Sequence, residues 1–547
     1  MRRWLPGLLV AFGLMLAFFA GARTNRAHDV WFRAGREAAL ERRTQAPHGA
    51  RAKSVILFVG DGMGLSTVAA ARILAGQQAG GPGEDHWLSF ERLPYTALSR
   101  TYNTNQQVPE SAGTMSALIT GVKTRAGSLS LDETVTSGDF EAVPEHSVPT
   151  LIEQAEARGL ATGVVTNTTI THATPAACYA HSPHRDWEVD AKLSEAARAA
   201  GFPDLARQLV EFAHGDGLEI ALGGGRAHFL GASAPDPEEI GAHGLRLDER
   251  DLTKEWLARY PDGAYVWNLD QFDALDAAQT RRVLGLFDPG HMEFEIDRAK
   301  DTAGEPSLTE MTEKAIELLS KNPRGFVLMV EGGKIDHAHH ANNAHRALSE
   351  TIELSRAVQR ALDLTRAEET LIVVTADHSQ PLVFAGYATR GNPILGKLVI
   401  NGSDGKPMEQ PLPDAFGRPM TTLSYPAGPG NVAASDEQPK GPKKFPHLPP
   451  VPPGAEIPRY RGGDVPRPDL SNVDTAAAGY LQEAHVPLAA GMHAGEDVAI
   501  YAGGPGAELF TGVREQNYVY HAIVEALGWN RAAPAADARA EPVPQLP

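Results

Sequence analysis

Short runs of apolar residues alternate along the chain with longer segments whose apolar positions recur at helical spacing. The runs that we expect to form strands are residues 55–59, 162–166, 326–330 and 371–374. Helical spacing covers residues 309–320 and 344–365. Strands without polar alternation are buried on both faces, and strands that alternate with helices build α/β proteins. The pattern predicts an α/β fold with a large, mostly parallel central sheet that binds ligands at the carboxyl ends of its strands.

Both ends of the chain depart from this alternation. Residues 1–22 combine Arg2 and Arg3, an apolar stretch and a small-residue site at residues 20–22, which is the pattern of a signal peptide. An uncleaved N-terminal anchor is the alternative, and only then would the protein contact a membrane. Both alternatives predict an extracytoplasmic protein, secreted or periplasmic. Residues 532–547 are rich in Ala and Pro and predict a disordered tail.

An N-terminal arm, residues 23–50, precedes the first expected strand. Within it, residues 29–43 have the pattern of a helix in which Val30, Phe32 and Leu40 stand among charged residues. This helix either packs on a partner subunit or lies solvated on its own domain. The sequence leaves both alternatives open.

A region rich in Pro, Gly and Lys interrupts the alternation at residues 426–468. Because proline lacks an amide hydrogen and fixes φ, we expect neither a core strand nor a helix there. We place this region in an inserted surface segment at residues 398–485. The insertion divides the catalytic domain into residues 51–397 and residues 486–531.

The composition restricts which partners and metal ligands the chain can use. The chain has 547 residues and a formal net charge of −18, which argues against nucleic-acid binding through phosphate contacts. Cys178 is the single cysteine, which excludes an internal disulfide and a cysteine-rich zinc site. Any bound metal must therefore be held by Asp, Glu and His, and it would supply the positive charge that a phosphate requires.

Carboxylates and histidines follow the expected strands at their carboxyl ends. Asp61 lies in a glycine-rich turn after the first strand, and Glu331 ends the third. Asp336 and His340 are four residues apart, so on a helix they share one face, which is a metal-ligand spacing. A solvated helix start is the alternative interpretation of that run.

Two further clusters extend this pattern. Asp377 and His378 follow the fourth strand, and His493 precedes another apolar run at residues 498–501. Each of these residues alone is as readily structural as metal-binding. Four such clusters on one sheet are not explained by structural roles alone, because buried charges destabilise the fold unless they are paired or bind a metal. Together they predict ligands for two or more divalent ions.

Ser111 is the candidate nucleophile. It stands before a helical run of small residues, so we expect it at a helix N-terminus, where free amides and the helix dipole favour an anion. Taken alone, Ser111 would be an ordinary N-cap. The Gly-x-Ser-x-Gly turn of many serine hydrolases is not present around it.

Taken in order, these motifs closely resemble the alkaline phosphatase family. The segments that carry the resemblance are DGMG, ESAGT, HATPA, EGGKIDHAHH, TADHS and HAGEDV, within residues 29–529. The helical arm, RGNPILG after TADHS and the inserted region, which resembles a "crown", are similar to the animal-type branch. The resemblance implies a three-layer α/β/α fold, a homodimer, and hydrolysis of small phosphate monoesters to alcohol and inorganic phosphate.

Carried over residue by residue, the resemblance implies two zinc ions and one magnesium ion per chain. The implied ligands are Asp336, His340 and His493 for one zinc, Asp61, Asp377 and His378 for the other, and Asp61, Thr174 and Glu331 for magnesium. Ser111 would carry a phosphoserine intermediate beside the second zinc, and Arg185 would bind phosphate oxygens.

Besides Arg185, the resemblance concerns three further positions in substrate binding. Glu110 stands where the family has Asp, and that residue braces the phosphate-binding arginine, so the sequence leaves the placement of Arg185 open. His172 and His337 correspond to positions in the outer shell of the third metal and the phosphate. The resemblance therefore makes Arg185, Glu110, His172 and His337 the implied substrate-binding residues.

The animal-type branch also has a calcium site. Its later ligands correspond to the Phe287 carbonyl, Asp288 and Glu305. Its first carboxylate falls on Ala200, and this chain has an insertion before Glu305. The sequence therefore leaves calcium binding open.

Two other functions compete with a phosphate monoesterase. A phosphodiesterase of the same superfamily keeps two metals but generally lacks the third-metal ligands and the arginine, whereas this chain has Thr174, Glu331 and Arg185. A binding protein with a degenerate site would lack ligands, and no implied ligand of the two zinc ions and the magnesium is missing. Both alternatives are therefore less favoured.

Overall fold

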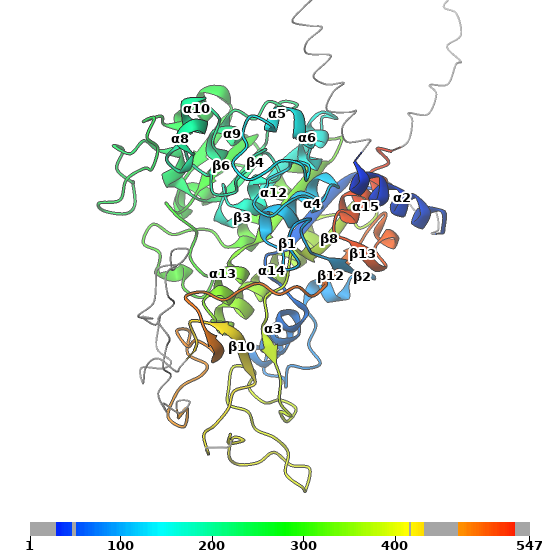
Figure 1. The fold of residues 1–547 in the computed structure, drawn as a ribbon, viewed down its shortest axis with the longest axis vertical. Coiled ribbons are helices and arrows are strands. Elements are labelled where there is room, and N and C mark those ends of the chain that lie inside the picture. Colours follow the sequence, from blue (N-terminus) through cyan, green and yellow to red (C-terminus); the bar gives the residue numbers. More distant parts are fainter. Residues whose placement is uncertain (1–28, 46–50, 415–416, 432–468, 531–547) are drawn as a thin grey trace, which may run out of the picture.

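The computed structural model describes residues 29–45, 51–414, 417–431 and 469–530 (Figure 1). The strands of its main sheet are β1 (Ser54–Gly60), β2 (Tyr95–Arg100), β3 (Ala161–Thr169), β4 (Ile220–Gly224), β5 (Gly263–Val266), β6 (Arg282–Leu286), β7 (Phe326–Gly332), β8 (Thr370–Ala376), β12 (Val498–Gly503) and β13 (Gly512–Glu515). They form a ten-stranded sheet in the order β13-β2-β12-β8-β1-β7-β3-β4-β6-β5.

Helices lie between most of these strands in the sequence. They are α2 (Val30–Gln45), α3 (Leu65–Gln78), α4 (Ser111–Thr120), α5 (Val143–His146), α6 (Leu151–Glu156), α7 (Ala173–Ala176), α8 (Glu195–Ala199), α9 (Leu205–Val210), α10 (Leu252–Arg259), α11 (Leu269–Asp273), α12 (Leu308–Leu319), α13 (Lys334–His340), α14 (Ala344–Leu364) and α15 (Tyr518–Ala526). No helix in the described ranges is both long and apolar enough to cross a membrane.

The centre of the sheet confirms the strands expected from the apolar runs. β8, β1, β7 and β3 lie side by side in parallel, and every residue of these four strands is buried. A strand buried on both faces needs apolar residues at consecutive positions, which explains why the sequence shows runs there. The sheet is mostly parallel, but β12 runs antiparallel to both of its neighbours, β8 and β2.

Two apolar layers sandwich the sheet. Alternate residues of a strand point to opposite faces, so Val55 and Leu57 join one buried cluster while Ile56 and Phe58 join the other. The first cluster packs α4, α6 and α15 on one face, and the second packs α3, α12 and α14 on the other. The predicted three-layer α/β/α fold is therefore confirmed.

The predicted N-terminal helix is present as α2, and one of its faces is buried against its own chain. The Phe32 ring contacts the His521 ring of α15 with centroids 4.8 Å apart. A Cβ on Gly35 would meet the same histidine, and Ala39 is fully buried in the first apolar cluster. Figure 1 shows α2 beside α15. The helix is thus docked rather than solvated, and a contact with a second subunit stays a prediction.

A small sheet refines the expectation about the inserted region. Its strands are β9 (Val383–Phe384), β10 (Leu423–Gly428) and β11 (Ala484–Pro487), in the order β11-β10-β9. Pro426, which we expected to lie outside any core strand, is part of β10 in this separate sheet. Its neighbours Tyr425 and Ala427 pair with β11, whereas β9 pairs only with Leu423 and Ser424. Pro426 lies beyond the end of β9, where a missing amide hydrogen costs no ladder bond.

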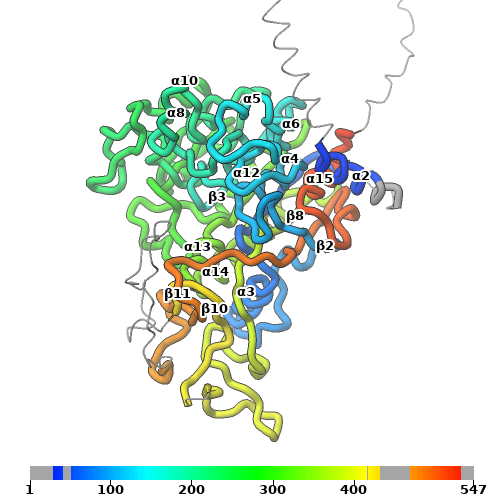
Figure 2. Tube along the Cα trace, in the orientation of Figure 1, coloured from blue at the N-terminus to red at the C-terminus, as the bar shows by residue number. Residues whose placement is uncertain are grey.

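The chain between β9 and β10 projects away from the main sheet, as the yellow segment of Figure 2 shows. Most of the Pro-rich stretch, the predicted signal segment and the predicted tail lie outside the described residues. The two parts of the predicted catalytic domain contribute neighbouring strands to one sheet, because β12 pairs with β8. The parts therefore fold together.

The amino-terminal edge of the sheet holds a pair of acids, the buried Glu156 and the half-buried Glu219. Glu156 Oε1 accepts a hydrogen bond from Thr162 Oγ1 at 2.5 Å, and Glu219 Oε2 accepts one from the Thr162 amide at 2.7 Å. Burial raises the pKa of Glu156 to about 8, with a contribution from the charge of Glu219. Burial also raises the pKa of Glu219 to about 7. The fold therefore prefers the protonated form of Glu156 at neutral pH.

Glu156→Gln should stabilise the protein at alkaline pH. Because the folded pKa lies above the unfolded value, Glu156 favours the fold when protonated, and this contribution is lost as pH rises toward about 8. We expect the Tm of the variant to exceed that of the wild type by ~3 °C at about pH 9 and to match it near pH 5. Thermal unfolding at both pH values measures this, with Glu368→Gln at an exposed carboxylate as the control. A shift of equal size at both pH values would contradict the assignment.

Candidate active site and metal centre

Ser111 begins α4, as predicted, but it does not cap the helix. Glu110 is the N-cap, and its carboxylate accepts hydrogen bonds from the amides of Ala112 at 3.1 Å and Gly113 at 2.8 Å. The amides that we expected to be free for an anion are therefore already used by Glu110. The buried Ser111 hydroxyl lies 3.2 Å from His378 Nε2 and 3.4 Å from Asp61 Oδ2.

Asp61 stands in the tight turn that follows β1. Gly62 has φ +68, its amide donates to Asp377 Oδ1 at 3.1 Å, and a Cβ there would lie 2.9 Å from Asp336 Oδ1. The turn therefore needs glycine both for its left-handed backbone and for the close approach of carboxylates. Burial raises the pKa of Asp61 well above its usual value, and the charge of Asp377 raises it further.

The first donor group consists of Asp61, Asp377 and His378. Nε2 of His378 lies 3.3 Å from Asp61 Oδ1 and 3.4 Å from Asp377 Oδ2, and all three side chains are fully buried. One ligand atom from each residue lies within 4.8 Å of the others. The structure thus brings together the set predicted for one zinc, directly beside Ser111.

The second donor group consists of Asp336, His340 and His493. His340 Nε2 lies 3.1 Å from Asp336 Oδ2 and 3.0 Å from His493 Nε2. Asp336 and His340 share one face of α13, as their spacing predicted. His493 joins them although it precedes β12, because the N-terminal end of an antiparallel strand lies at the same edge as the carboxyl ends of its parallel neighbours.

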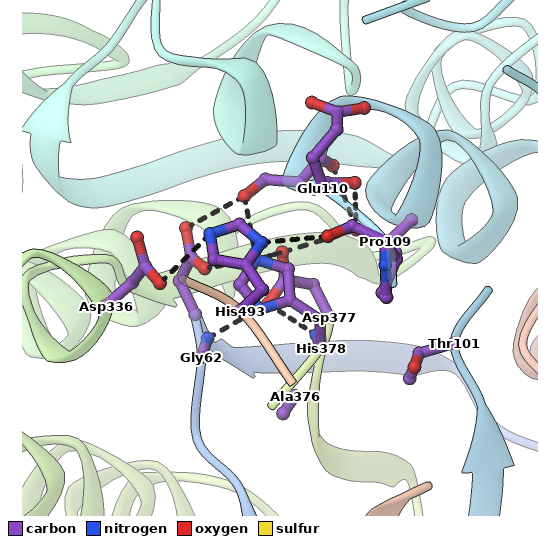
Figure 3. Close-up of polar contacts among 12 residues, drawn as sticks. Gly62, Thr101, Pro109, Glu110, Asp336, Ala376, Asp377, His378 and His493 are labelled. Carbon is purple, nitrogen blue, oxygen red and sulfur yellow. Dashed lines mark hydrogen bonds and ion pairs between the residues drawn. The ribbon is translucent and has the colours of Figure 1, made fainter. Parts of the chain in front are cut away.

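Backbone carbonyls orient both histidines of this group. Nδ1 of His340 lies 2.7 Å from the Gly491 carbonyl, and Nδ1 of His493 lies 2.8 Å from the Pro109 carbonyl. A carbonyl accepts only from a protonated nitrogen, so Nδ1 of each ring carries a proton, and the neutral form of each ring has its lone pair on Nε2. Figure 3 shows His493 between Asp336 and Pro109. The His378 ring stacks on the His493 ring at 3.7 Å, so the first two groups are adjacent.

A third group surrounds Glu331 at the end of β7. Asp61 Oδ1, Thr174 Oγ1 and Glu331 Oε1 are buried and have no hydrogen-bond partner within the described part of the chain. Burial raises the pKa of Glu331 to about 7. Buried oxygens that lack hydrogen-bond donors can instead bind a cation, and a set of three oxygens suits magnesium. His172 also lies near Asp61 and Glu331, closer to this group than its predicted outer position implied.

Arg185 is braced by Glu110 despite the departure from the family residue. Arg185 Nη1 donates to Glu110 Oε2 at 2.7 Å, and Glu110 Oε1 also accepts from the Gly127 amide at 2.7 Å. Burial alone would raise the pKa of Glu110, but the Arg185 guanidinium and the amides of Gly127 and Gly113 lower it. Arg185 Nη2 lies 3.0 Å from His172 Nε2. The longer side chain therefore keeps the ion pair that the sequence left in question.

His291 completes a histidine cluster that the sequence analysis missed. Its ring centroid lies 4.5 Å from that of His337 and 5.6 Å from that of His172. Burial lowers the pKa of His291 to about 4 and of His337 to about 3, and it lowers that of His172 well below its usual value. All three rings are thus neutral near pH 7. His291 follows β6, a strand that the sequence analysis did not predict, so the rule that drew attention to the carboxyl ends of strands could not be applied to it.

The predicted calcium position keeps two carboxylates. Burial raises the pKa of Asp288 to about 6 and of Glu305 to about 8, and the charge of Asp288 contributes to the second shift. Glu305 Oε2 is buried without a hydrogen-bond partner in the described residues. Ala200, the C-cap of α8, brings no carboxylate. Calcium binding at Asp288 and Glu305, which the sequence left open, therefore stays open.

Known proteins resemble this chain over most of its length. The family model described as alkaline phosphatase matches residues 52–529. The tissue-nonspecific alkaline phosphatase of Gallus gallus is 43% identical over 496 residues, covering 89% of this chain and 87% of that protein. The Homo sapiens isozyme is 40% identical over 497 residues, covering 89% and 86%. The crystal structure of the Thermus thermophilus alkaline phosphatase aligns with a TM-score of 0.60 at 24% identity, covering 90% of this chain and 94% of that one.

Removal of divalent ions should make stability more sensitive to pH. Asp61 and Glu331 have raised pKa values without a metal, so they favour the fold while protonated, and this contribution is lost as pH rises through the raised pKa of each group, which is about 7 for Glu331. Between about pH 6 and 9, the Tm of chelator-treated protein should fall by ~5 °C more than that of metal-loaded protein. Calorimetry of both forms checks this, with restoration of zinc and magnesium as the control. Equal pH slopes in the two forms would argue against the metal site.

Proposed function

This chain belongs to the alkaline phosphatase family, and we propose that Ser111 is the nucleophile with which it hydrolyses phosphate monoesters. The family and the activity predicted from the sequence motifs are confirmed, and the relatives favour a monoesterase over the phosphodiesterase alternative. The observation that carries the proposal is the buried Ser111 hydroxyl, which lies between Asp61 and His378 at the start of α4.

The protein binds metal, and we assign three ions to its donor groups. One zinc is assigned to Asp61, Asp377 and His378, a second zinc to Asp336, His340 and His493, and magnesium to Asp61, Thr174 and Glu331. Mixed His and Asp donors suit zinc, and an all-oxygen set suits magnesium. When bound, these ions supply positive charge that favours ionisation of the Ser111 hydroxyl and offsets the charge of the phosphate and the departing oxygen.

Arg185 is the residue that we assign to phosphate binding. Glu110 accepts from Nη1 of the guanidinium and His172 contacts Nη2, and the remaining N–H groups are left for two phosphate oxygens. His172 contacts Arg185 directly, so it helps to orient the guanidinium. His337 lies in the same histidine cluster and completes the proposed substrate-binding set with Glu110.

The reaction proceeds in two displacements on phosphorus. In the first, Ser111 Oγ loses its proton and bonds to phosphorus, the ester bond breaks, and the alcohol leaves after taking up a proton. In the second, a water oxygen bonds to phosphorus from the side that the alcohol left, and Ser111 Oγ departs and regains a proton. The phosphoserine intermediate forms on Ser111, and two in-line steps restore the original configuration.

We also propose a homodimer outside the cytoplasm that does not bind nucleic acid. The extracytoplasmic location rests on the signal pattern of residues 1–22, and the dimer rests on the family resemblance. The inserted region at residues 398–485 would lie between the two parts of the catalytic domain, residues 51–397 and 486–531. β10 lies within this insertion, but β9 of the same small sheet precedes residue 398 and β11 extends past residue 485, so these boundaries stay a proposal.

Ser111→Ala should abolish the phosphoenzyme and lower kcat on the order of 10³-fold or more, because the nucleophile is lost. Zinc and magnesium content should stay near that of the wild type, since none of the assigned ligands changes. Radiolabelled phosphate trapped on acid-quenched protein, together with elemental analysis, measures both effects. Label that still appears on the variant would exclude Ser111 as the nucleophile.

Arg185→Ala should weaken inhibition by inorganic phosphate by roughly 10- to 100-fold, because a charge-assisted bidentate contact is lost. The metals should stay bound. Asp186→Ala is a matched control, since Asp186 is exposed and lies 3.9 Å from Arg185 Nε. Steady-state inhibition constants for the two variants decide the role. Unchanged inhibition in Arg185→Ala would show that the guanidinium does not face the phosphate.

A further inference from the structure

The turn between α13 and α14 lies against the small sheet rather than in solvent. Asn342 in this turn is fully buried and has φ +54, a left-handed conformation that asparagine tolerates better than most residues. The turn directly follows the helix that carries Asp336 and His340. Its contacts therefore bear on the second donor group.

Asn342 bonds to the inserted region from both its side chain and its backbone. Its Oδ1 accepts from the Gly430 amide at 3.0 Å, and its Nδ2 donates to the Ala427 carbonyl at 3.2 Å. Its backbone carbonyl accepts from the Gln482 amide at 2.8 Å. The end of β10 and the approach to β11 are thus held by one residue of the metal-ligand turn.

The packing around Asn342 leaves no room for larger neighbours. A Cβ on Gly428 would lie 2.0 Å from Asn342 Oδ1, and a Cβ on Gly491 would lie 3.3 Å from its Nδ2. Glycines at these positions let the two backbones close around the asparagine side chain. The contact is therefore specific in shape as well as in hydrogen bonding.

Gly491 connects this contact to both histidine ligands. Its amide donates to the His340 carbonyl at 2.7 Å, and its carbonyl accepts from His340 Nδ1 at 2.7 Å. Gly491 stands two residues before His493. The position of this backbone segment therefore sets the tautomer of His340 and the approach of His493.

His339 makes a second, independent link. It is fully buried on α13, with Nδ1 2.7 Å from the Tyr425 hydroxyl of β10 and Nε2 3.0 Å from Thr67 Oγ1 of α3. The inserted sheet is thus joined to this part of the chain at two residues, His339 on α13 and Asn342 in the turn that follows it. Asn342 is the member of the pair that also reaches the segment leading to His493.

We propose that Asn342 is a positioning residue that clamps the inserted sheet onto the turn after α13 and so holds His340 and His493 at the spacing needed to share one divalent ion. Two of the three donors come from α13 and the third from a loop, so their spacing depends on what joins the two segments. Replacing a residue that contacts a metal ligand but not the metal itself typically changes the metal affinity about 10- to 100-fold. The inference rests on the proposed assignment of Asp336, His340 and His493 to one ion.

Asn342→Gly tests the clamp, because glycine keeps the left-handed backbone and removes only the side-chain bonds. The zinc-loaded variant should release one ion per chain to a chelator about 10-fold faster than the wild type. Asn342→Asp, which still accepts from Gly430 but no longer donates to Ala427, should be intermediate. Asn431→Ala is the matched control, because Asn431 bonds to the carbonyls of Ala484 and His485 within the small sheet. It should release zinc within about twofold of the wild-type rate.

Zinc release and the visible spectrum of the cobalt-loaded protein are the measurements. Faster release and an altered cobalt spectrum in Asn342→Gly alone would support the clamp. Wild-type behaviour of Asn342→Gly would overturn it, as would equal acceleration in Asn431→Ala, which indicates general loosening of the sheet. His340→Ala identifies which ion is lost. If it removes no zinc, the ligand assignment itself fails and the proposal fails with it.

Discussion

Four carboxylates buried at one edge of the sheet, Asp61, Glu331, Asp336 and Asp377, are the constraint on which the site depends. Charges excluded from water repel one another strongly, and burial raises the pKa values of Asp61 and Glu331. The side chains around them lower this cost only in part, through His340, His378 and His493. Orphaned oxygens on Asp61, Thr174 and Glu331 leave the remaining compensation to divalent cations.

The fold supplies this convergence through strand direction. Parallel central strands end at the same edge, so residues that follow β1, β7 and β8 meet there. The antiparallel strand β12 begins at that edge and brings His493 to it. The partial positive charge at the N-terminus of α4 is offset by the chain itself, because the Glu110 carboxylate accepts hydrogen bonds from the first amides of that helix. Arg185 lies beside this helix start, and its ion pair with Glu110 fixes where it points.

The inserted region is connected to the chemistry rather than appended to it. Its small sheet meets the metal-ligand helix through His339 and through the turn at Asn342, and Gly491 carries the contact onward to His340 and His493. Because a close-packed interior has few voids, a small displacement of the inserted sheet is passed on to the residues that it contacts. The geometry of the donor group Asp336, His340 and His493 is thereby linked to a part of the chain remote in sequence.

The sequence alone determined the central strands, the helices between them, the glycine turn at Asp61 and the shared face of Asp336 and His340. These features depend on periodicity and on neighbours within a few residues. Only the tertiary structure decided that Glu110 holds Arg185, 75 residues away, that His291 joins His172 and His337, and that Pro426 fits inside a strand. It also decided that Asn342 closes on the inserted sheet. Such contacts join segments far apart in the chain, and their partners are selected by packing and burial, which no local pattern records.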